Sequence, residues 1–397
     1  MAPQVMRKPA IILLFLSLAA AAAVAAPWGT VATTETPVDK ERLATADLAR
    51  YLGQVTDTAV TVSPRGTWEK APVPAVLIER DESISGEAYR IVPGQKNGVY
   101  TVTVAGGSPQ GVVNGVYGLL RTLGYRFYLG SESVPASLPD KLPSSGPIEG
   151  KPAFSVRGVL PWYNFFNSPT AWDPIDHRAF VDQLIRSGAN FLTFHTYDAE
   201  PFAAYEENGS VKEGAPLLNT GSPTWGTSGT RVDEFAFGTD KLYLAPYFGA
   251  ASTVEGRGAD DAVRREKSIL RDALAYARQR GVHPALGFEI TGDPTQPDVC
   301  ERFIKRFNAV LDYYPMLEYV FLWQAETQGA QGFAGQPNQQ IAASAPLQSP
   351  IQLFGMERRG AFTRAVDRTT GERPFFQDNE AGKRARANEG ARLEQFA

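Results

Sequence analysis

The chain has 397 residues, of which 43% are hydrophobic and 21% charged, the proportions of a globular protein long enough for two domains. A formal net charge of −4 gives no electrostatic reason to expect nucleic acid or an anionic membrane surface as a partner. The single cysteine, Cys300, excludes an internal disulfide framework and follows the pattern of a residue in the core.

The first 25 residues have the features of a secretory signal peptide. Arg7 and Lys8 precede an apolar run, and residues 23–25 (Ala-Val-Ala) supply a small-residue cleavage site. The apolar run is short for a membrane span. We therefore expect a secreted or periplasmic protein that has no membrane association once the signal is cleaved.

Residues 30–150 predict a small α/β domain. The pattern gives helices at 40–53 and 111–123, strands at 74–78, 88–92, 99–105 and 126–128, and a linker at 131–150. The second helix begins within GGSPQGVVNG (residues 106–115), which follows a strand as a dinucleotide-binding loop does. Its glycine spacing is not G-x-G-x-x-G and no ribose-binding acid follows at the expected distance, so we expect no cofactor.

Residues 151–397 alternate between strands and helices. Strands are expected at 156–160, 191–194, 283–290 and 317–323, helices before Gly188 and at 261–280 and 297–314, and a long insertion at 199–260. A strand–helix–strand unit forces parallel pairing. We interpret this region as the first four or so units of a (β/α)₈ TIM-type barrel; a doubly wound α/β sheet has the same local pattern.

Only four strands can be counted, whereas a barrel needs eight. Residues 379–397 read as a helix that has no stop signal. From this pattern we expect an incomplete barrel whose first and fourth strands are both open edges.

Carboxylates near the ends of two strands are the candidate catalytic groups. Glu326 follows a strand that ends in aromatic residues, where an apolar wall would raise its pKa and suit it to general acid catalysis. Glu289 ends the third strand and is the candidate second carboxylate, with Asp293 just beyond it. The competing interpretations are a solvated loop glutamate for Glu326 and structural hydrogen bonding for Glu289.

Polar and aromatic side chains near the same strands are candidates for binding sugar. A stacking platform with hydrogen-bonding neighbours is expected from Trp162, Tyr163, Asn164, His195 and Trp323, and packing in the loop and core is the alternative for them. Arg157, at the start of the first strand, could reach a substrate carboxylate or hydroxyl, or form a salt bridge at the barrel floor. The three histidines are scattered and no H-E-x-x-H or G-x-S-x-G motif occurs, so neither a metal site nor a serine hydrolase is expected.

Three stretches resemble glycoside hydrolases of the α-glucuronidase and β-N-acetylhexosaminidase families. Residues 111–135 (GVVNGVYGLLRTLGYRFYLGSESVP) resemble the small α/β domain that precedes the barrel in these families. Residues 154–162 (FSVRGVLPW) and 191–198 (FLTFHTYD) resemble their first two barrel strands. The resemblance implies a general acid after the fourth strand, which is Glu326.

The chain departs from both families at that position. Hexosaminidases carry an adjacent Asp-Glu pair there, whereas this chain has Ala325-Glu326. In α-glucuronidases the second carboxylates lie on later strands than the four that can be counted.

The sequence therefore predicts a secreted hydrolase of O-glycosyl bonds, with little or no activity in these 397 residues. The alternative is a non-catalytic carbohydrate-binding or scaffold protein.

Overall fold

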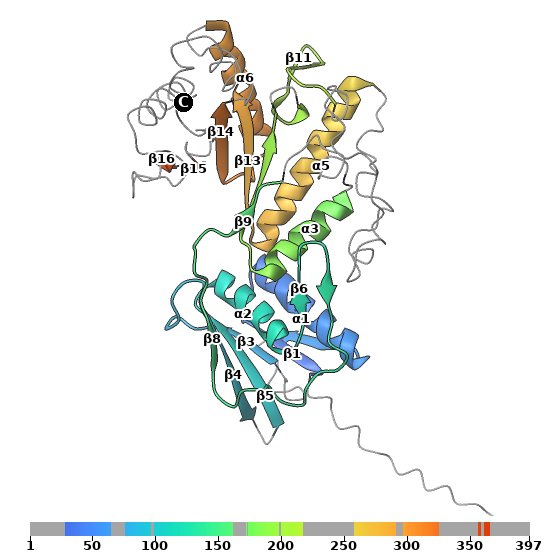
Figure 1. The fold of residues 1–397 in the computed structure, drawn as a ribbon, viewed down its shortest axis with the longest axis vertical. Coiled ribbons are helices and arrows are strands. Elements are labelled where there is room, and N and C mark those ends of the chain that lie inside the picture. The colour runs from blue at the N-terminus through green and yellow to red at the C-terminus, as the bar shows by residue number, and fades with distance from the viewer. Residues whose placement is uncertain are drawn as a thin grey trace, which may run out of the picture.

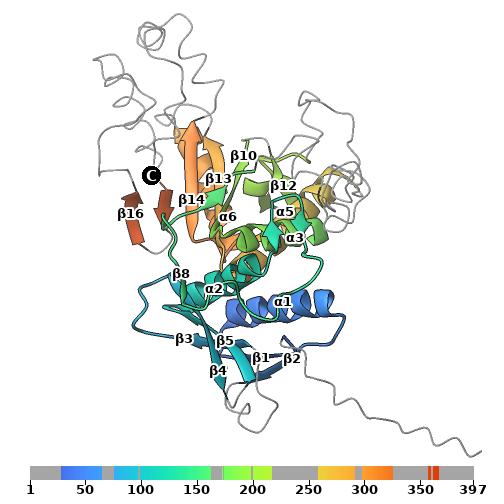
Figure 2. The ribbon, with the colours of Figure 1, turned by 60° about the horizontal axis from the view of Figure 1, so that its bottom comes forward.

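The computed structural model describes residues 28–64, 76–96, 99–161, 172, 174–197, 200–216, 258–290, 297–324, 356–358 and 361–365. Two six-stranded sheets organise these residues, and Figures 1 and 2 show helices lying between them. The predicted signal peptide and the helix expected at 379–397 lie outside the described residues. None of the described helices is both long and apolar enough to cross a membrane.

The first sheet has the order β2-β1-β3-β5-β4-β8. Its strands are β1 (Thr30–Thr33), β2 (Thr61–Pro64), β3 (Val76–Arg80), β4 (Tyr89–Lys96), β5 (Val99–Gly106) and β8 (Ile148–Gly150). Neighbours among β2, β1, β3 and β5 are parallel, and β4 runs antiparallel between β5 and β8. β4 and β5 correspond to the strands expected at 88–92 and 99–105.

Short strands account for the differences from the sequence prediction in this sheet. β1 and β2 have four residues each, and their sequences, TVAT and TVSP, give neither an apolar run nor a strict alternation of apolar and polar residues. The segment read as a linker, 131–150, contains both β8 and β7 (Glu132–Ser133). β7 pairs with β6 (Arg126–Phe127) in a separate two-stranded sheet.

Two helices cover one face of this sheet, α1 (Asp39–Thr56) and α2 (Pro109–Thr122). The glycine-containing segment that opens α2 serves close packing. The Ser108 hydroxyl accepts a hydrogen bond from the amide of Gly111 at 3.1 Å, which caps the helix. A Cβ at Gly106 would lie 2.1 Å from the backbone nitrogen of Val112, so β5 passes directly into the first turn of α2. The glycines thus have a structural explanation that involves no nucleotide.

The second sheet has the order β16-β15-β14-β13-β10-β9. Its parallel part consists of β9 (Gly158–Val159), β10 (Phe191–Thr196), β13 (His283–Ile290) and β14 (Tyr319–Gln324), side by side in sequential order. This order confirms the parallel pairing predicted from the βα alternation. The helices are α3 (Pro174–Ser187), α5 (Ala259–Arg280) and α6 (Pro297–Tyr313).

The expected open edge at the fourth strand is wrong. β15 (Met356–Arg358) pairs antiparallel with β14, and β16 (Ala361–Ala365) continues the sheet. Antiparallel addition needs no crossover helix, so the βα rhythm gave no sign of it. The described residues form a mixed α/β structure and no closed barrel.

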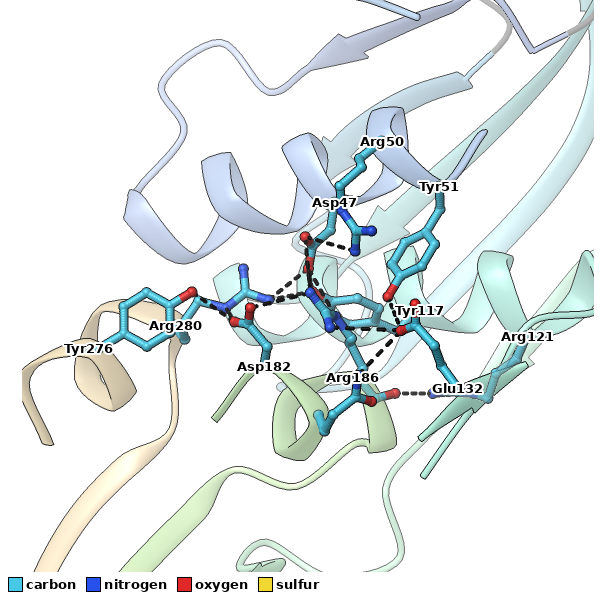
Figure 3. A network of polar contacts seen from close by, with 11 residues as sticks. Asp47, Arg50, Tyr51, Tyr117, Arg121, Glu132, Asp182, Arg186, Tyr276 and Arg280 are labelled. Atoms are coloured by element: carbon cyan, nitrogen blue, oxygen red, sulfur yellow. Dashed lines mark hydrogen bonds and ion pairs between the residues drawn. The ribbon is translucent and has the colours of Figure 1, made fainter. Parts of the chain in front are cut away.

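A polar network joins α1 and α2 to α3 and α5 (Figure 3). Asp47 of α1 accepts hydrogen bonds from the Tyr117 hydroxyl at 2.6 Å and from the Arg280 guanidinium at 2.7 Å. Arg186 of α3 lies 3.4 Å from the same carboxylate, and Asp182 pairs with Arg280 at 2.8 Å. Arg186 and Arg280 are both buried, so the two sheets are held together through charged side chains that solvent barely reaches.

Burial alone would raise the pKa of the Asp47 carboxyl. The ion pairs with Arg186 and Arg280 and the hydrogen bond from Tyr117 outweigh that effect and hold its pKa well below its ordinary value. Asp47 therefore carries its charge throughout the physiological pH range. It holds the helices α3 and α5 against the first sheet with α1 and α2, which together we call the first unit.

Candidate functional site

The carboxyl ends of β9, β10, β13 and β14 meet at one edge of the second sheet, which we call the carboxyl edge. In parallel α/β sheets this is the edge at which ligands bind. β9 leads to it at Pro161, whose carbonyl oxygen accepts a hydrogen bond from the amide of His195 at 3.0 Å. The first two strands therefore stay paired up to the edge itself.

Ring contacts identify the face of the sheet that the helices cover. Phe194 of β10 lies 5.9 Å from His177 of α3, measured between ring centroids. Phe288 of β13 lies 6.2 Å from Phe303 of α6. Because side chains alternate along a strand, the residues next to Phe194 and Phe288 belong to the opposite face.

That opposite face is aromatic near the amino ends of the strands. Phe191 of β10 packs edge-on against Tyr319 of β14, with ring centroids 5.3 Å apart, and also contacts Phe321 at 6.2 Å. Phe191 and His195 are four residues apart on one strand and so share this face. The contacts among Phe191, Tyr319 and Phe321 therefore lie toward the amino edge of this face, and His195 lies toward the carboxyl edge.

The strand register gathers three predicted site residues at this end of the face. His195 aligns with Gly287 of β13, Glu289 follows Gly287 by two positions, and Glu289 aligns with Trp323 of β14. Positions 195, 289 and 323 thus lie on one face, on three adjacent strands. At Glu289 and Trp323 the structure describes the strand positions and not the side chains.

The His195 side chain is only 3% exposed. Its ring lies edge-on to Tyr197, with centroids 4.9 Å apart. The neighbouring Thr196 hydroxyl donates a hydrogen bond to the Gly287 carbonyl at 3.0 Å. The end of β10 is thus anchored to β13 on one side and to Pro161 on the other, which gives His195 a fixed position.

Arg157 requires a correction, because it lies at the opposite edge. Its side chain pairs with Glu87 at 2.7 Å and donates to the Gly188 carbonyl at 2.8 Å, and its amide donates to Asn190 at 2.9 Å. These partners lie in the first unit and at the turn that enters β10. Arg157 therefore forms the floor salt bridge, the alternative considered from the sequence, and is not part of the carboxyl edge.

Four predicted residues lie outside the described residues: Trp162, Tyr163, Asn164 and Glu326. The first three directly follow the Pro161 end of β9. Glu326 comes two positions after Gln324, the last residue of β14. Their place in the chain is adjacent to the carboxyl edge, and their roles stay predictions.

Sequence reasoning missed one acid at this edge, Glu200. Its side chain is 1% exposed and accepts a hydrogen bond from the amide of Tyr197 at 2.9 Å. The Glu200 amide donates back to the Tyr197 carbonyl at 3.1 Å, which closes the turn. The sequence signal is the acid directly before the apolar run Pro201-Phe202-Ala203 inside a segment read as an open insertion.

Two of the three histidines lie at opposite ends of the second sheet. His283 lies at the amino end of β13, where Nδ1 is 2.8 Å from Glu318, while His195 lies near the carboxyl end of β10. Burial lowers the pKa of His177 to about 3, so this ring is neutral. Within the described ranges no group of three His, Cys, Asp or Glu side chains could hold a metal ion.

No protein-family model matches the chain, and no curated protein matches it. Among solved structures, it is similar to a GH20 exo-β-N-acetylglucosaminidase from Vibrio harveyi in complex with N-acetylglucosamine. The identity is 14% over 75% of this chain and 43% of that chain, with a TM-score of 0.45. A β-N-acetylhexosaminidase from Bacteroides fragilis gives 11% identity over 74% of this chain and 52% of that chain, with a TM-score of 0.40.

A GH138 enzyme targeting pectin rhamnogalacturonan II gives 12% identity over 74% of this chain and 30% of that chain, with a TM-score of 0.41. These three structures are glycoside hydrolases. The chain spans 43%, 52% and 30% of their respective lengths.

Proposed function

We propose that this chain is a secreted or periplasmic carbohydrate-active protein whose sugar site is the carboxyl edge of the second sheet, and that its chemistry is hydrolysis of O-glycosyl bonds. The observation that carries the proposal is the register that brings positions 195, 289 and 323 together on one face. The sequence resemblance to glycoside hydrolases supports the same reaction class.

Glycosidic hydrolysis needs two carboxyl groups, one on each side of the scissile bond. Adjacent strands lie about 4.8 Å apart. Carboxylates that follow two neighbouring strands therefore fall within reach of the separations used by glycosidases, about 5 Å in retaining and about 6.5–9.5 Å in inverting enzymes. We propose Glu289 on β13 and Glu326 as this pair; Glu289 aligns with Trp323 of β14, and Glu326 comes three positions later in the chain.

In this proposal Glu326 protonates the leaving oxygen as the bond to the anomeric carbon breaks. Glu289 acts on the other side of the sugar, either by attacking that carbon or by taking a proton from the water that attacks it. His195 hydrogen-bonds a sugar hydroxyl, and Trp162, Tyr163 and Trp323 stack against the ring, with Asn164 beside them. The proposal needs no metal or cofactor.

The test is hydrolysis of a panel of aryl glycosides and aryl glucuronides by the wild type and by Glu326→Gln, Glu289→Gln and Glu82→Gln. Glu82 is an exposed carboxylate in the first unit and is the matched control. Loss of the general acid should slow substrates with poor leaving groups about 10²–10⁴-fold and activated ones far less, because a good leaving group needs no proton. Equal slowing of both classes would remove Glu326 from the acid role.

The competing function is carbohydrate binding without catalysis. Calorimetric titration with the same sugars separates the two. Saturable binding with no turnover of even the most activated substrate would favour the binding protein. Absence of both binding and turnover over the panel would contradict the proposal.

A further inference from the structure

A segment that we call the strap, residues 200–213, follows the turn at the end of β10 and packs against α5 and α6. It contains the 3₁₀ helix η3 (Pro201–Ala203) and the hairpin of β11 (Tyr205–Glu207) and β12 (Ser210–Lys212). Phe202, Ala203 and Ala204 are all buried, and η3 contacts both α5 and α6. The sequence prediction treated this stretch as part of a long insertion.

One buried cation holds the inner part of the strap. The Lys267 ammonium, on α5, donates a hydrogen bond to the carbonyl oxygen of Ala204 and lies 4.5 Å from the centroid of the Tyr313 ring on α6. The Lys267 residue is only 8% exposed. Burial lowers its pKa to about 8, so the ammonium form still dominates at neutral pH.

The outer part of the strap is held by exposed charges. Arg264 pairs with Glu206 at 2.9 Å, and Lys305 of α6 lies 3.6 Å from Glu207. The amide of Val211 donates to a carboxylate of α5 at 3.0 Å. Water and salt screen these exposed ion pairs, so the buried contact dominates the anchoring.

The inner end of the strap reaches the carboxyl edge. Glu200 directly precedes η3, and its carboxylate binds the amide of Tyr197. Tyr197 in turn lies against the ring of His195. The path from Lys267 therefore runs through its bond to Ala204, along the backbone of η3 to Glu200, and from the Glu200 carboxylate to the end of β10.

We propose that Lys267 is a positioning residue for the carboxyl edge, acting through Ala204 and Glu200 to fix Tyr197 beside His195. The inference deepens the proposed function, since it assigns the strap to the sugar site. The geometric part of it, the coupling of Lys267 to His195, is independent of whether the protein hydrolyses anything.

The chain has only three histidines, so their ring signals can be resolved and assigned by NMR. Lys267→Met keeps the length of the side chain and removes the donor. It should shift the His195 signal and leave that of His283, at the far end of the sheet, in place. Lys305→Met removes an exposed cation of α6 that pairs with Glu207 of the strap, and is the control. Lys267→Arg, which can donate to the same carbonyl, should restore the wild-type position.

Hydrogen exchange of backbone amides measures the same coupling and does not depend on the histidine ring signals. Leaving a buried acceptor unpaired should raise the equilibrium constant for local opening roughly 5- to 150-fold, the equivalent of about 1–3 kcal/mol. The Tyr197 amide should lose protection by that factor in Lys267→Met and not in Lys305→Met. If Lys267→Met does not fold, Tyr313→Leu, which removes the ring beside the ammonium, is read in the same way.

An unchanged His195 signal in folded Lys267→Met, or equal effects of the two methionine variants, would overturn the proposal. So would a wild-type Tyr197 amide that exchanges as fast as an exposed loop. Because these readouts use no substrate, a failure of the proposed function would appear only in the hydrolysis and binding assays.

Discussion

Asp47→Asn is the sharpest test of how the two sheets are joined. The substitution removes one negative charge from between Arg186 and Arg280 and keeps an oxygen that can accept the hydrogen bond from Tyr117. The Asp47 side chain is only 14% exposed. Water can therefore replace little of the lost interaction.

Removing one partner of a buried ion pair costs about 3–5 kcal/mol, because the other charge stays buried. Here Asp182 still faces both arginines, at 2.8 Å from Arg280 and 3.3 Å from Arg186. We therefore expect a loss at the lower end, about 3 kcal/mol. Asp39→Asn, on the same helix, is the matched control. Asp39 and its partner Arg42 are both exposed, so its loss should be about 0–1 kcal/mol.

Urea unfolding of wild type and the two variants measures both losses of unfolding free energy, provided that the slope of that free energy against urea concentration is the same for all three proteins. The pH profile gives an independent check. The Asp47 pKa lies well below its value of 3.8 in the unfolded chain, so its contribution is present above about pH 4 and is lost as the pH falls. The difference in the free energy of unfolding between wild type and Asp47→Asn should become smaller below pH 4. Equal midpoints for Asp47→Asn and Asp39→Asn would refute the network as a source of stability.

Three further substitutions test the packing around both sheets. Gly107→Ala would put a Cβ 2.1 Å from the Ile84 carbonyl oxygen and should lower the free energy of unfolding by roughly 1–3 kcal/mol, whereas Gly130→Ala, with no atom within 4 Å, should be near neutral in urea. The pKa of His177 is about 3 against 6.5 unfolded, so stability should fall by up to about 1.4 kcal/mol per unit as the pH drops from about 6.5 to 3. His177→Phe should remove that slope, and a ring signal titrating near pH 6.5 would contradict the assignment. Arg157→Met should cost roughly 1–3 kcal/mol in urea unfolding and leave sugar affinity unchanged in calorimetry; a weaker affinity would put Arg157 back in the site.

The parallel order of β10, β13 and β14 could be predicted because strands of six or eight residues alternate with amphipathic helices over that region, and the apolar run at 156–160 indicated β9 before them. β8 and β15 could not, because each has three residues and is ordered by the strand that it pairs with. Neither three-residue stretch shows in its own residues which strand it will pair with.

In the candidate site, too, some features could be predicted from the sequence and others could not. The position of His195 at the end of β10 follows from the strand itself, and its alignment with Gly287 follows from sequential pairing. Arg157 precedes Gly158, the first residue of β9, so the strand direction already assigns it to the amino edge. Asp47 and Arg280 are 233 positions apart, and no local pattern shows that two charged helix residues will be buried together.

The most direct test of the sugar site is a titration of the wild-type protein with the sugar panel, followed through the ring signals of its three histidines. His195 lies at the carboxyl edge and His283 at the amino edge of adjacent strands, so each signal reports on its own end of one sheet. The account predicts a saturable shift of the His195 signal by at least one sugar, with His283 unmoved. A sugar that binds and shifts His283 while leaving His195 in place would contradict a carbohydrate site at the carboxyl edge.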